Sequence, residues 1–195
     1  SDPDVPRATE LVEGLRADGA ADVRVIEDPL ELIADEGVAL GGSLLSETAR
    51  IGGLAAPAFA RGLAAELAGL ANVRVLTRTT VFGWYDSAVF GAVERVQKHV
   101  AVPDPHRPVE RLWRIVAKAA VLATGAEERP LVFGGNDRPG VMMAGAMRAY
   151  LNRWAVAPGR RPAIFTNTDS GYALAADLEA AGVEVAAIVD PRAER

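Results

Sequence analysis

Two acidic residues follow a short apolar run in the stretch LIADEGVALGGSL, which spans residues 32–44. A carboxylate at the carboxyl end of a parallel strand can accept hydrogen bonds from the ribose hydroxyls of a bound dinucleotide. Asp35 or Glu36 is suited to this role, and Gly37 would let the backbone pass close to the adenosine. The same residues are also typical of a turn that leaves a strand, and both interpretations stay open.

Gly41, Gly42 and Ser43 follow a few residues later. Glycine has no Cβ to keep a pyrophosphate away from backbone N–H groups, and the Ser43 hydroxyl adds a donor. The glycine pair therefore predicts a segment near a pyrophosphate, although ordinary loops use such pairs more often.

A third candidate is the run VLATG at residues 121–125. An apolar strand that ends in small residues brings the chain back beside the cofactor in two-dinucleotide-binding folds, because small side chains permit close approach. We therefore expect Thr124 and Gly125 to line the site. The alternative is a strand that simply ends in a glycine turn.

The sequence TNTDSG stands near the end of the chain, where a second phosphate loop would need the pattern G-x-G-x-x-G. Only the last glycine, Gly171, is kept, and this glycine serves helix-to-strand packing. Thr166 carries a side chain where the backbone would approach a phosphate, and Asp169 would repel it. We expect the fold to survive here without pyrophosphate binding, with Asp169 or Ser170 as the helix cap.

The composition describes a globular chain of 195 residues, half of them apolar, with no cysteine and a net charge of −5. The lack of cysteine excludes disulfides, thiolate metal sites and cysteine nucleophiles, and favours a cytoplasmic location. No basic cluster predicts nucleic-acid binding, and no apolar stretch reaches the ~20 residues that cross a membrane. His99 and His106 match no triad or metal-ligand pattern, so we expect both to face solvent and predict no catalytic or metal-binding residue.

Hydrophobic periodicity predicts the elements that must position these residues. In chain order they are a helix at 6–19, strands at 23–27 and 31–36, a helix at 57–70, an antiparallel meander with a closing strand within 73–125, a helix at 141–156, and a β-turn-α-β unit at 162–190. This order predicts an α/β protein with a partial Rossmann-like two-dinucleotide-binding flavoprotein fold, in which a parallel sheet with helices accompanies an antiparallel β-meander.

Several longer runs resemble the alpha subunit of heterotetrameric sarcosine oxidase. These runs are GGSLLSE, LTRTTVFGWYD, ERPLVF with GNDRPGV, and FTNTDS, and the resemblance extends from about Leu32 to the end of the chain. The ERPLVF and GNDRPGV runs and the degenerate FTNTDS loop favour this family over the similar flavoprotein subunits of opine dehydrogenases and hydrogen cyanide synthase.

The resemblance implies that the chain is an NAD-binding region, with NAD in the position where related folds hold FAD. The implied cofactor neighbours are Asp35, Glu36 and Gly37 at the adenosine ribose, Ser43 near the pyrophosphate, the backbone of Val81 at the adenine, and Thr124 with Gly125 close by. None of these residues is implied to be a catalytic acid, base or nucleophile.

The family implies a reaction that belongs to a larger assembly. Heterotetrameric sarcosine oxidases oxidatively demethylate sarcosine to glycine with oxygen and tetrahydrofolate, and form hydrogen peroxide and methylene-tetrahydrofolate. The resemblance implies beta, gamma and delta subunits as partners, with FAD on beta and with FMN at the alpha/beta interface. FMN, FAD and tetrahydrofolate are thus expected only in the complete assembly, and the isolated chain is expected to be inactive.

Residues 1–31 depart from the family pattern, because they lack the glycine-rich phosphate loop that precedes the acid-tipped strand. We therefore predict weak or absent NAD binding by this chain. The expected parts are a non-matching helix-strand segment at 1–30, a partial dinucleotide-binding domain with the meander at 31–145, and the start of a second, degenerate βαβ unit at 146–195. Two alternatives are an FAD-binding subunit of an opine dehydrogenase or cyanide synthase, and a non-catalytic interaction module with a vestigial nucleotide site.

Overall fold

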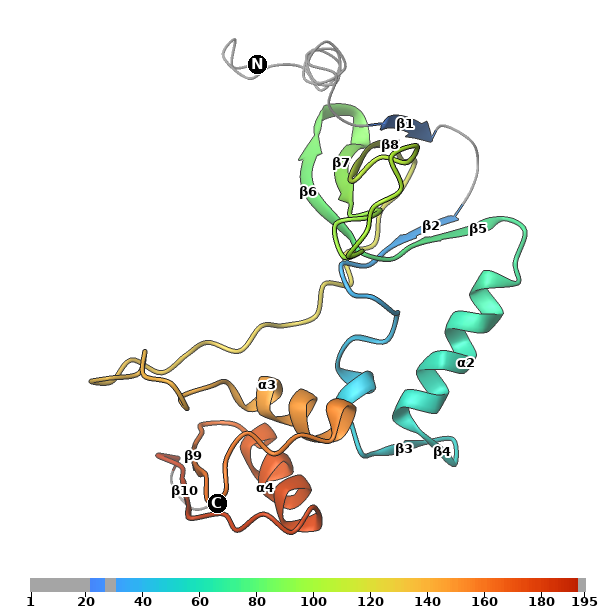
Figure 1. The fold of residues 1–195 in the computed structure, drawn as a ribbon. Coiled ribbons are helices and arrows are strands. Elements are labelled where there is room, and N and C mark those ends of the chain that lie inside the picture. The colour runs from blue at the N-terminus through green and yellow to red at the C-terminus, as the bar shows by residue number, and fades with distance from the viewer. Residues whose placement is uncertain (1–21, 27–30, 193–195) are drawn as a thin grey trace. The chain divides into compact units, whose positions relative to one another are not determined.

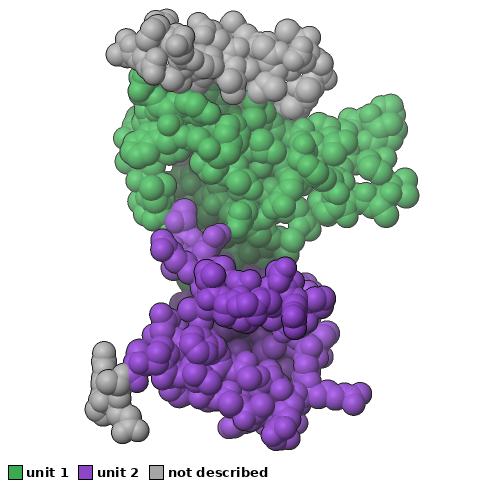
Figure 2. Space-filling view, turned by 90° about the vertical axis from the view of Figure 1, so that its left-hand side faces the viewer, with its two compact units in different colours: residues 1–40, 63–123 green, residues 41–62, 124–195 purple. Residues whose placement is uncertain are grey.

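The structure, a computed structural model, describes residues 22–26 and 31–192, so the helix predicted at 6–19 lies outside the described residues. The chain divides into two compact units, coloured green and purple in Figure 2. Unit 1 comprises residues 1–40 and 63–123, and unit 2 comprises residues 41–62 and 124–195.

Unit 1 contains a four-stranded sheet in the order β1-β8-β7-β6 (Figure 1). β1 (Asp22–Ile26) pairs in parallel with β8 (Arg111–Val116). β8, β7 (Val89–Glu94) and β6 (Thr79–Tyr85) are antiparallel neighbours, and the 3-10 turn η2 (Asp86–Ala88) joins β6 to β7. The predicted meander is therefore confirmed, as expected for runs rich in β-branched and aromatic residues.

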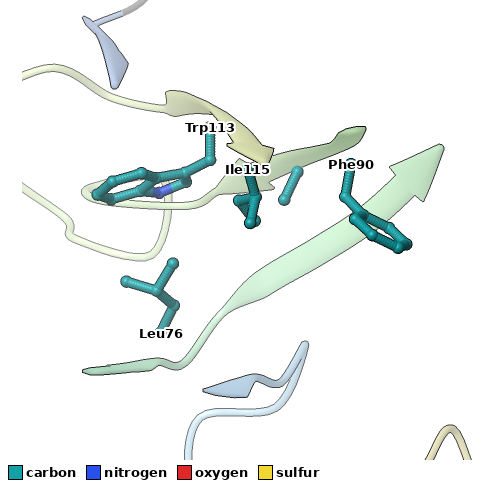
Figure 3. Close-up of a cluster of buried hydrophobic side chains, with 5 residues drawn as sticks. Leu76, Phe90, Trp113 and Ile115 are labelled. Carbon is teal, nitrogen blue, oxygen red and sulfur yellow. The ribbon is translucent and has the colours of Figure 1, made fainter. Parts of the chain in front are cut away.

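A buried apolar cluster, most of it on β7 and β8, fixes the register of this sheet. Its members are Leu76, Phe90, Ala92, Trp113 and Ile115 (Figure 3). Trp113 is 2% exposed, and its indole Nε1 donates to a Glu94 carboxylate oxygen at 2.9 Å. The large ring is therefore buried while its one polar group keeps a partner, which makes the burial worth about 2–3 kcal/mol. A slip of one residue would turn the buried face of β8 outward.

Unit 1 also contains a two-stranded parallel sheet of β2 (Glu31–Ala34) and β5 (Val73–Leu76). The helix α2 (Ala56–Ala68) lies between these strands in the sequence. Its run APAFARGLAAELA combines proline in the first turn with strong helix formers, which explains why a helix begins there. The helix predicted at 57–70 and the strand predicted after Pro29 are both confirmed in position.

Unit 2 begins with the 3-10 helix η1 (Gly42–Ser46) and a hairpin of β3 (Arg50–Ile51) and β4 (Leu54–Ala55). Farther along the chain, α3 (Ala144–Arg148) continues directly into the π-helical turn η3 (Ala149–Arg153). The predicted helix in this region is thus confirmed in position, but its second half widens into a π-turn. Such turns occur often at functional sites.

A parallel β-α-β unit closes unit 2, as the sequence predicts. It consists of β9 (Ala163–Phe165), α4 (Ser170–Ala180) and β10 (Ala187–Val189). The apolar core of the unit joins α3, β9 and α4, and its buried members are Met147, Ile164, Leu174, Ala175 and Leu178.

Residues 117–143 form neither helix nor strand, so the closing strand predicted at residues 121–125 is wrong. Figure 1 draws the segment as a long extended trace. Val121 is 92% exposed and Leu122 is 72% exposed. A strand requires a hydrogen-bonded neighbour, and no strand in the described part of the chain pairs with this segment.

Candidate functional site

The acid turn, residues 35–37, directly follows β2 in unit 1. The N–H of Asp35 donates to the carbonyl of Leu76 at 2.9 Å, and the carbonyl of Asp35 accepts the N–H of Thr79 at 2.9 Å. These bonds extend the pairing of β2 with β5 and tie the turn to the start of β6. An acid therefore stands at the carboxyl end of a parallel strand, where the sequence predicts it.

The Asp35 carboxylate folds back over its own turn. Its Oδ1 accepts the N–H of Gly37 at 2.7 Å. A Cβ at Gly37 would lie 2.9 Å from that oxygen, so only glycine leaves the bond undisturbed. Within the described residues Oδ2 accepts no hydrogen bond, which leaves one carboxylate oxygen available to an external donor.

Glu36 is exposed and contributes its backbone rather than its side chain to the turn. Its carbonyl accepts Nη2 of Arg95 at 2.7 Å. The carbonyl of the next residue, Gly37, accepts the N–H of Arg78 at 2.8 Å. The acid turn is therefore held by Arg78, which directly precedes β6, and by Arg95, which directly follows β7.

Val81 lies in the same unit, on β6, two residues beyond the point where that strand meets the acid turn. It pairs with Ala92 and is 45% exposed. Thr79, which carries the contact to the turn, is 1% exposed, and its hydroxyl donates to the carbonyl of Thr77 at 3.0 Å. The strand that carries Val81 is thus anchored to the turn by a buried residue.

The glycine pair lies in unit 2 and serves two local purposes. A Cβ at Gly41 would lie 2.9 Å from the Cβ of Ala60, so this glycine permits close packing against α2. Gly42 has a φ of +51° and open space around it, so its conformation rather than its surroundings favours glycine. Ser43 is exposed within η1, and its hydroxyl has no partner among the described residues.

Thr124 and Gly125 also belong to unit 2, in the extended segment that follows the meander. Both are exposed, and Gly125 has a φ of +70° with nothing within 4 Å of a Cβ position. Asp35, Glu36, Gly37 and Val81 are therefore in unit 1, while Gly41, Gly42, Ser43, Thr124 and Gly125 are in unit 2. Neither unit alone holds the complete set.

The degenerate loop before α4 is closed by side chains. The Thr166 hydroxyl accepts the N–H of Thr168 at 3.1 Å and donates to the carbonyl of Thr168 at 2.9 Å. A Cβ at Gly171 would lie 2.6 Å from the Cβ of Thr166, so this glycine allows α4 to pack onto the end of β9. Asp169 occupies the position before the helix but does not cap it, because its carboxylate accepts Nη1 of Arg192 at 2.9 Å instead.

Sequence reasoning missed a buried polar network in unit 2, the Asp177 network, formed by Glu47, Thr48, Arg148, Asn152 and Asp177. Nε of Arg148 donates to Asp177 at 2.7 Å, and its two terminal nitrogens donate to the two oxygens of Glu47 at 2.8 and 2.9 Å. Asp177 also accepts the Thr48 hydroxyl at 2.7 Å and the Asn152 amide at 2.8 Å. The network joins the chain after η1 to α3, η3 and α4.

The electrostatics of the network favour the charged forms of its members. Burial alone would raise the pKa of Asp177, but hydrogen bonds from Thr48, Arg148 and Asn152 and the Arg148 charge hold that pKa below its usual value. Burial would lower the pKa of Arg148, yet its bonds to Glu47 and Asp177 raise it. The one sequence signal was an acid between Leu174 and Leu178, on the apolar face of a helix.

No protein-family model matches the chain. It is 68% identical over 184 residues to the sarcosine oxidase alpha subunit of Rhizobium meliloti (strain 1021), a match that covers 94% of this chain and 18% of the relative. It is 45% identical over 163 residues to the sarcosine oxidase alpha subunit of Corynebacterium sp. (strain P-1), which covers 83% of this chain and 17% of the relative. The chain therefore spans less than a fifth of the length of these curated relatives.

Two more distant similarities are found, one in sequence and one in structure. One opine oxidase subunit, from Agrobacterium tumefaciens (strain Ach5), is 33% identical over 126 residues, which are 65% of this chain and 24% of that protein. The crystal structure of L-proline dehydrogenase from P. horikoshii superposes with a TM-score of 0.65 at 23% identity, over 90% of this chain and 37% of that one. The fold class predicted from the sequence is thereby confirmed. No helix among the described residues is long and apolar enough to span a membrane.

Proposed function

Because the chain belongs to the family of sarcosine oxidase alpha subunits, of which it matches a segment, we propose that it provides the adenosine-binding side of a dinucleotide site, with NAD as the ligand. The observation that carries this proposal is the acid turn. It places a half-buried aspartate at the carboxyl end of β2 with one carboxylate oxygen unused by the described residues.

The proposed contacts follow from the chemistry of each group. Oδ2 of Asp35 accepts a ribose hydroxyl, and the bond from the Gly37 N–H keeps the carboxylate in a fixed rotamer before the ligand arrives. The exposed backbone edge of β6 near Val81 faces the adenine. For unit 2 the proposal is limited to the chemistry of its residues: the Gly41–Ser43 segment offers backbone N–H groups and a hydroxyl to a pyrophosphate, and Thr124 with Gly125 are proposed as further neighbours of the cofactor.

The reaction of the whole protein is a separate proposal that rests on the family alone, because the chain spans only 18% of the length of its relative. We propose that the complete enzyme oxidatively demethylates sarcosine to glycine, together with beta, gamma and delta subunits that carry the flavin chemistry. In that assembly this segment binds and orients a nucleotide and contributes no acid, base or nucleophile. The chain by itself is then inactive.

Saturation-transfer NMR with NAD tests the ribose contact, because the method detects the weak binding expected without a phosphate loop. We expect the adenine and adenosine-ribose protons to receive more saturation than the nicotinamide protons. Asp35→Asn should reduce the adenosine signals, while Asp86→Asn, which changes an exposed acid in the same unit, should leave them unchanged. Equal adenosine signals in wild type and Asp35→Asn would reject the proposal. Micromolar NAD affinity in calorimetry would contradict the predicted weakness.

FAD is the second candidate ligand, and the observation that supports it is the similarity to an opine oxidase subunit. The acid turn does not separate the two cofactors, because NAD and FAD share the adenosine diphosphate half. Quenching of flavin fluorescence on titration with the chain would support FAD. Competition between NAD and AMP without any flavin response supports NAD.

A further inference from the structure

A basic depression of about 340 Å³ lies in unit 1, beside the acid turn. It is lined by Val38, Arg78, Arg95, Lys98 and His99, so four of its five lining side chains carry nitrogen donors. The chain as a whole has a formal charge of −5. A basic cluster in a chain of net negative charge points to an anionic ligand.

Arg78 adopts a backbone conformation that disfavours a side chain. Its φ is +53°, in the left-handed region where glycine is the easiest residue. Two hydrogen bonds hold it there: its N–H donates to the carbonyl of Gly37 at 2.8 Å, and its carbonyl accepts the N–H of Arg95 at 3.0 Å. An arginine at a position suited to glycine indicates that its guanidinium has a use that offsets the conformational cost.

The charges of the depression are only partly neutralised. The Arg78 guanidinium makes no hydrogen bond or ion pair with any described residue. Nη2 of Arg95 donates to the backbone carbonyl of Glu36, and this neutral acceptor does not balance the positive charge of the guanidinium. Lys98 pairs with Glu110 at 2.9 Å, with 61% and 39% of the two side chains exposed. Two guanidinium groups therefore remain available to an anion.

We propose that the basic depression binds a phosphate monoester or inorganic phosphate, through Arg78 and Arg95 together. Guanidinium groups present paired N–H donors that match two phosphate oxygens, and the Lys98 charge and His99 ring add to the rim. The volume suits one phosphate with a small attached group rather than a polymer. No phenylalanine, tyrosine or tryptophan side chain lines the depression for base stacking, which argues against single-stranded nucleic acid.

This site is separate from the ribose contact proposed above, although both are built on the acid turn. The phosphate has two sources: a free phosphate, or a phosphate carried by an adenosine whose ribose binds Asp35. The first source does not depend on the proposed function, whereas the second rests on it. Inorganic phosphate and adenosine 2′,5′-bisphosphate distinguish the two.

The test is a titration of the ¹⁵N-labelled chain with inorganic phosphate at constant ionic strength, followed by the amide signals of residues 36–38, 78, 95 and 99. We expect the chemical shifts to saturate with a dissociation constant of about 1 mM. Arg78→Gly should weaken binding by about tenfold or more, because it removes the guanidinium while fitting the positive φ and thus preserving the fold. Arg61→Gln removes an equal charge from the exposed surface of α2 and should have no effect.

Three results would overturn the proposal: shifts that do not saturate, equal shifts with chloride, or unchanged binding in Arg78→Gly. Tighter binding of adenosine 2′,5′-bisphosphate than of phosphate, lost in Asp35→Asn, assigns the site to a nucleotide phosphate. Equal affinity for both ligands, with no effect of Asp35→Asn, assigns it to free phosphate and leaves only the ribose proposal in error.

Discussion

Arg148 and Asp177 form an ion pair with an Nε to Oδ2 distance of 2.7 Å, and their side chains are 11% and 7% exposed. The other two guanidinium nitrogens bind Glu47, so one arginine joins acids that are 130 residues apart in the sequence. Such a pair, once buried, is costly to break, because the remaining partner keeps its charge without water or counter-charge. Through its bonds to Glu47, Arg148 also holds the residues that follow η1, the 3-10 helix that contains Ser43.

Arg148→Ala should lower the free energy of unfolding by about 3–5 kcal/mol, because it leaves Asp177 charged and buried without a cation. Arg161→Ala is the matched control, since Nε of Arg161 also donates to a carboxylate, that of Glu184 at 2.8 Å, but the two side chains are 65% and 69% exposed. The control should lose less than about 1 kcal/mol. Urea unfolding followed by circular dichroism measures both. A loss in Arg148→Ala no larger than that of the control would contradict this account.

The Asp177 network also predicts a pH dependence of stability. The folded pKa of Asp177 lies below its usual value, so the folded state binds this proton less readily than the unfolded state does. The stabilisation is therefore complete above the unfolded pKa of about 4 and is lost as the pH falls through the folded pKa. Asp177→Asn should flatten that part of the pH profile of the unfolding free energy. Urea unfolding at a series of pH values from 7 to about 3 measures the slope, and parallel profiles would argue against the network.

Local signals in the sequence were sufficient for the elements whose contacts are local. The spacing of apolar residues placed α2 and α4, and the β-rich runs placed the meander, because helix and hairpin formation depends on neighbouring residues. The acid turn was also predicted at the end of β2. Whether its residues bind a nucleotide stays a prediction.

The features that the sequence did not reveal depend on distant partners. The run VLATG has the composition of a strand, but no strand in the described residues pairs with it. The hydrogen bonds of the Asp177 network join residues that are 25 to 129 positions apart, and no short pattern marks such a set. The cap predicted at Asp169 failed for the same reason, since Arg192 competes for its carboxylate. The division into units at residues 41–62 was not apparent either, and the predicted domain boundaries stay a prediction.

Gly171→Ala should destabilise the β9–α4 unit by about 1–3 kcal/mol, because the added methyl group would overlap Thr166 at 2.6 Å. Gly62→Ala provides a control of opposite sign. Gly62 lies inside α2 with nothing within 4 Å of a Cβ position, so alanine there should stabilise by about 0.5–1 kcal/mol. Thermal unfolding of the two variants compares them directly. A stabilised Gly171→Ala variant would show that the helix does not pack on the strand end as described.

Within the described residues, the extended segment after the meander should be cleaved by proteases before the sheet of unit 1. Residues 119–130 make no backbone hydrogen bond within the described chain, and such segments open at little cost in free energy. Chymotrypsin can cleave after Leu122 and Phe133, which are 72% and 51% exposed, and after Trp113 and Phe90, which are buried in the sheet of unit 1. At low protease concentration we expect cuts after Leu122 and Phe133 to appear before cuts after Trp113 and Phe90, as identified by mass spectrometry of the intact fragments.

Leu122→Ser should slow the cut at that position while leaving the cut after Phe133 unchanged, which separates loss of the cleavage site from a general change in stability. Early cleavage after Trp113 or Phe90 would mean that the meander opens more readily than the segment, against its paired strands and buried cluster. Protection of the segment on addition of the proposed partner subunits would support the proposal that this chain acts within a larger assembly. The same digestion therefore tests both the local stability of the chain and the place of this segment in a larger protein.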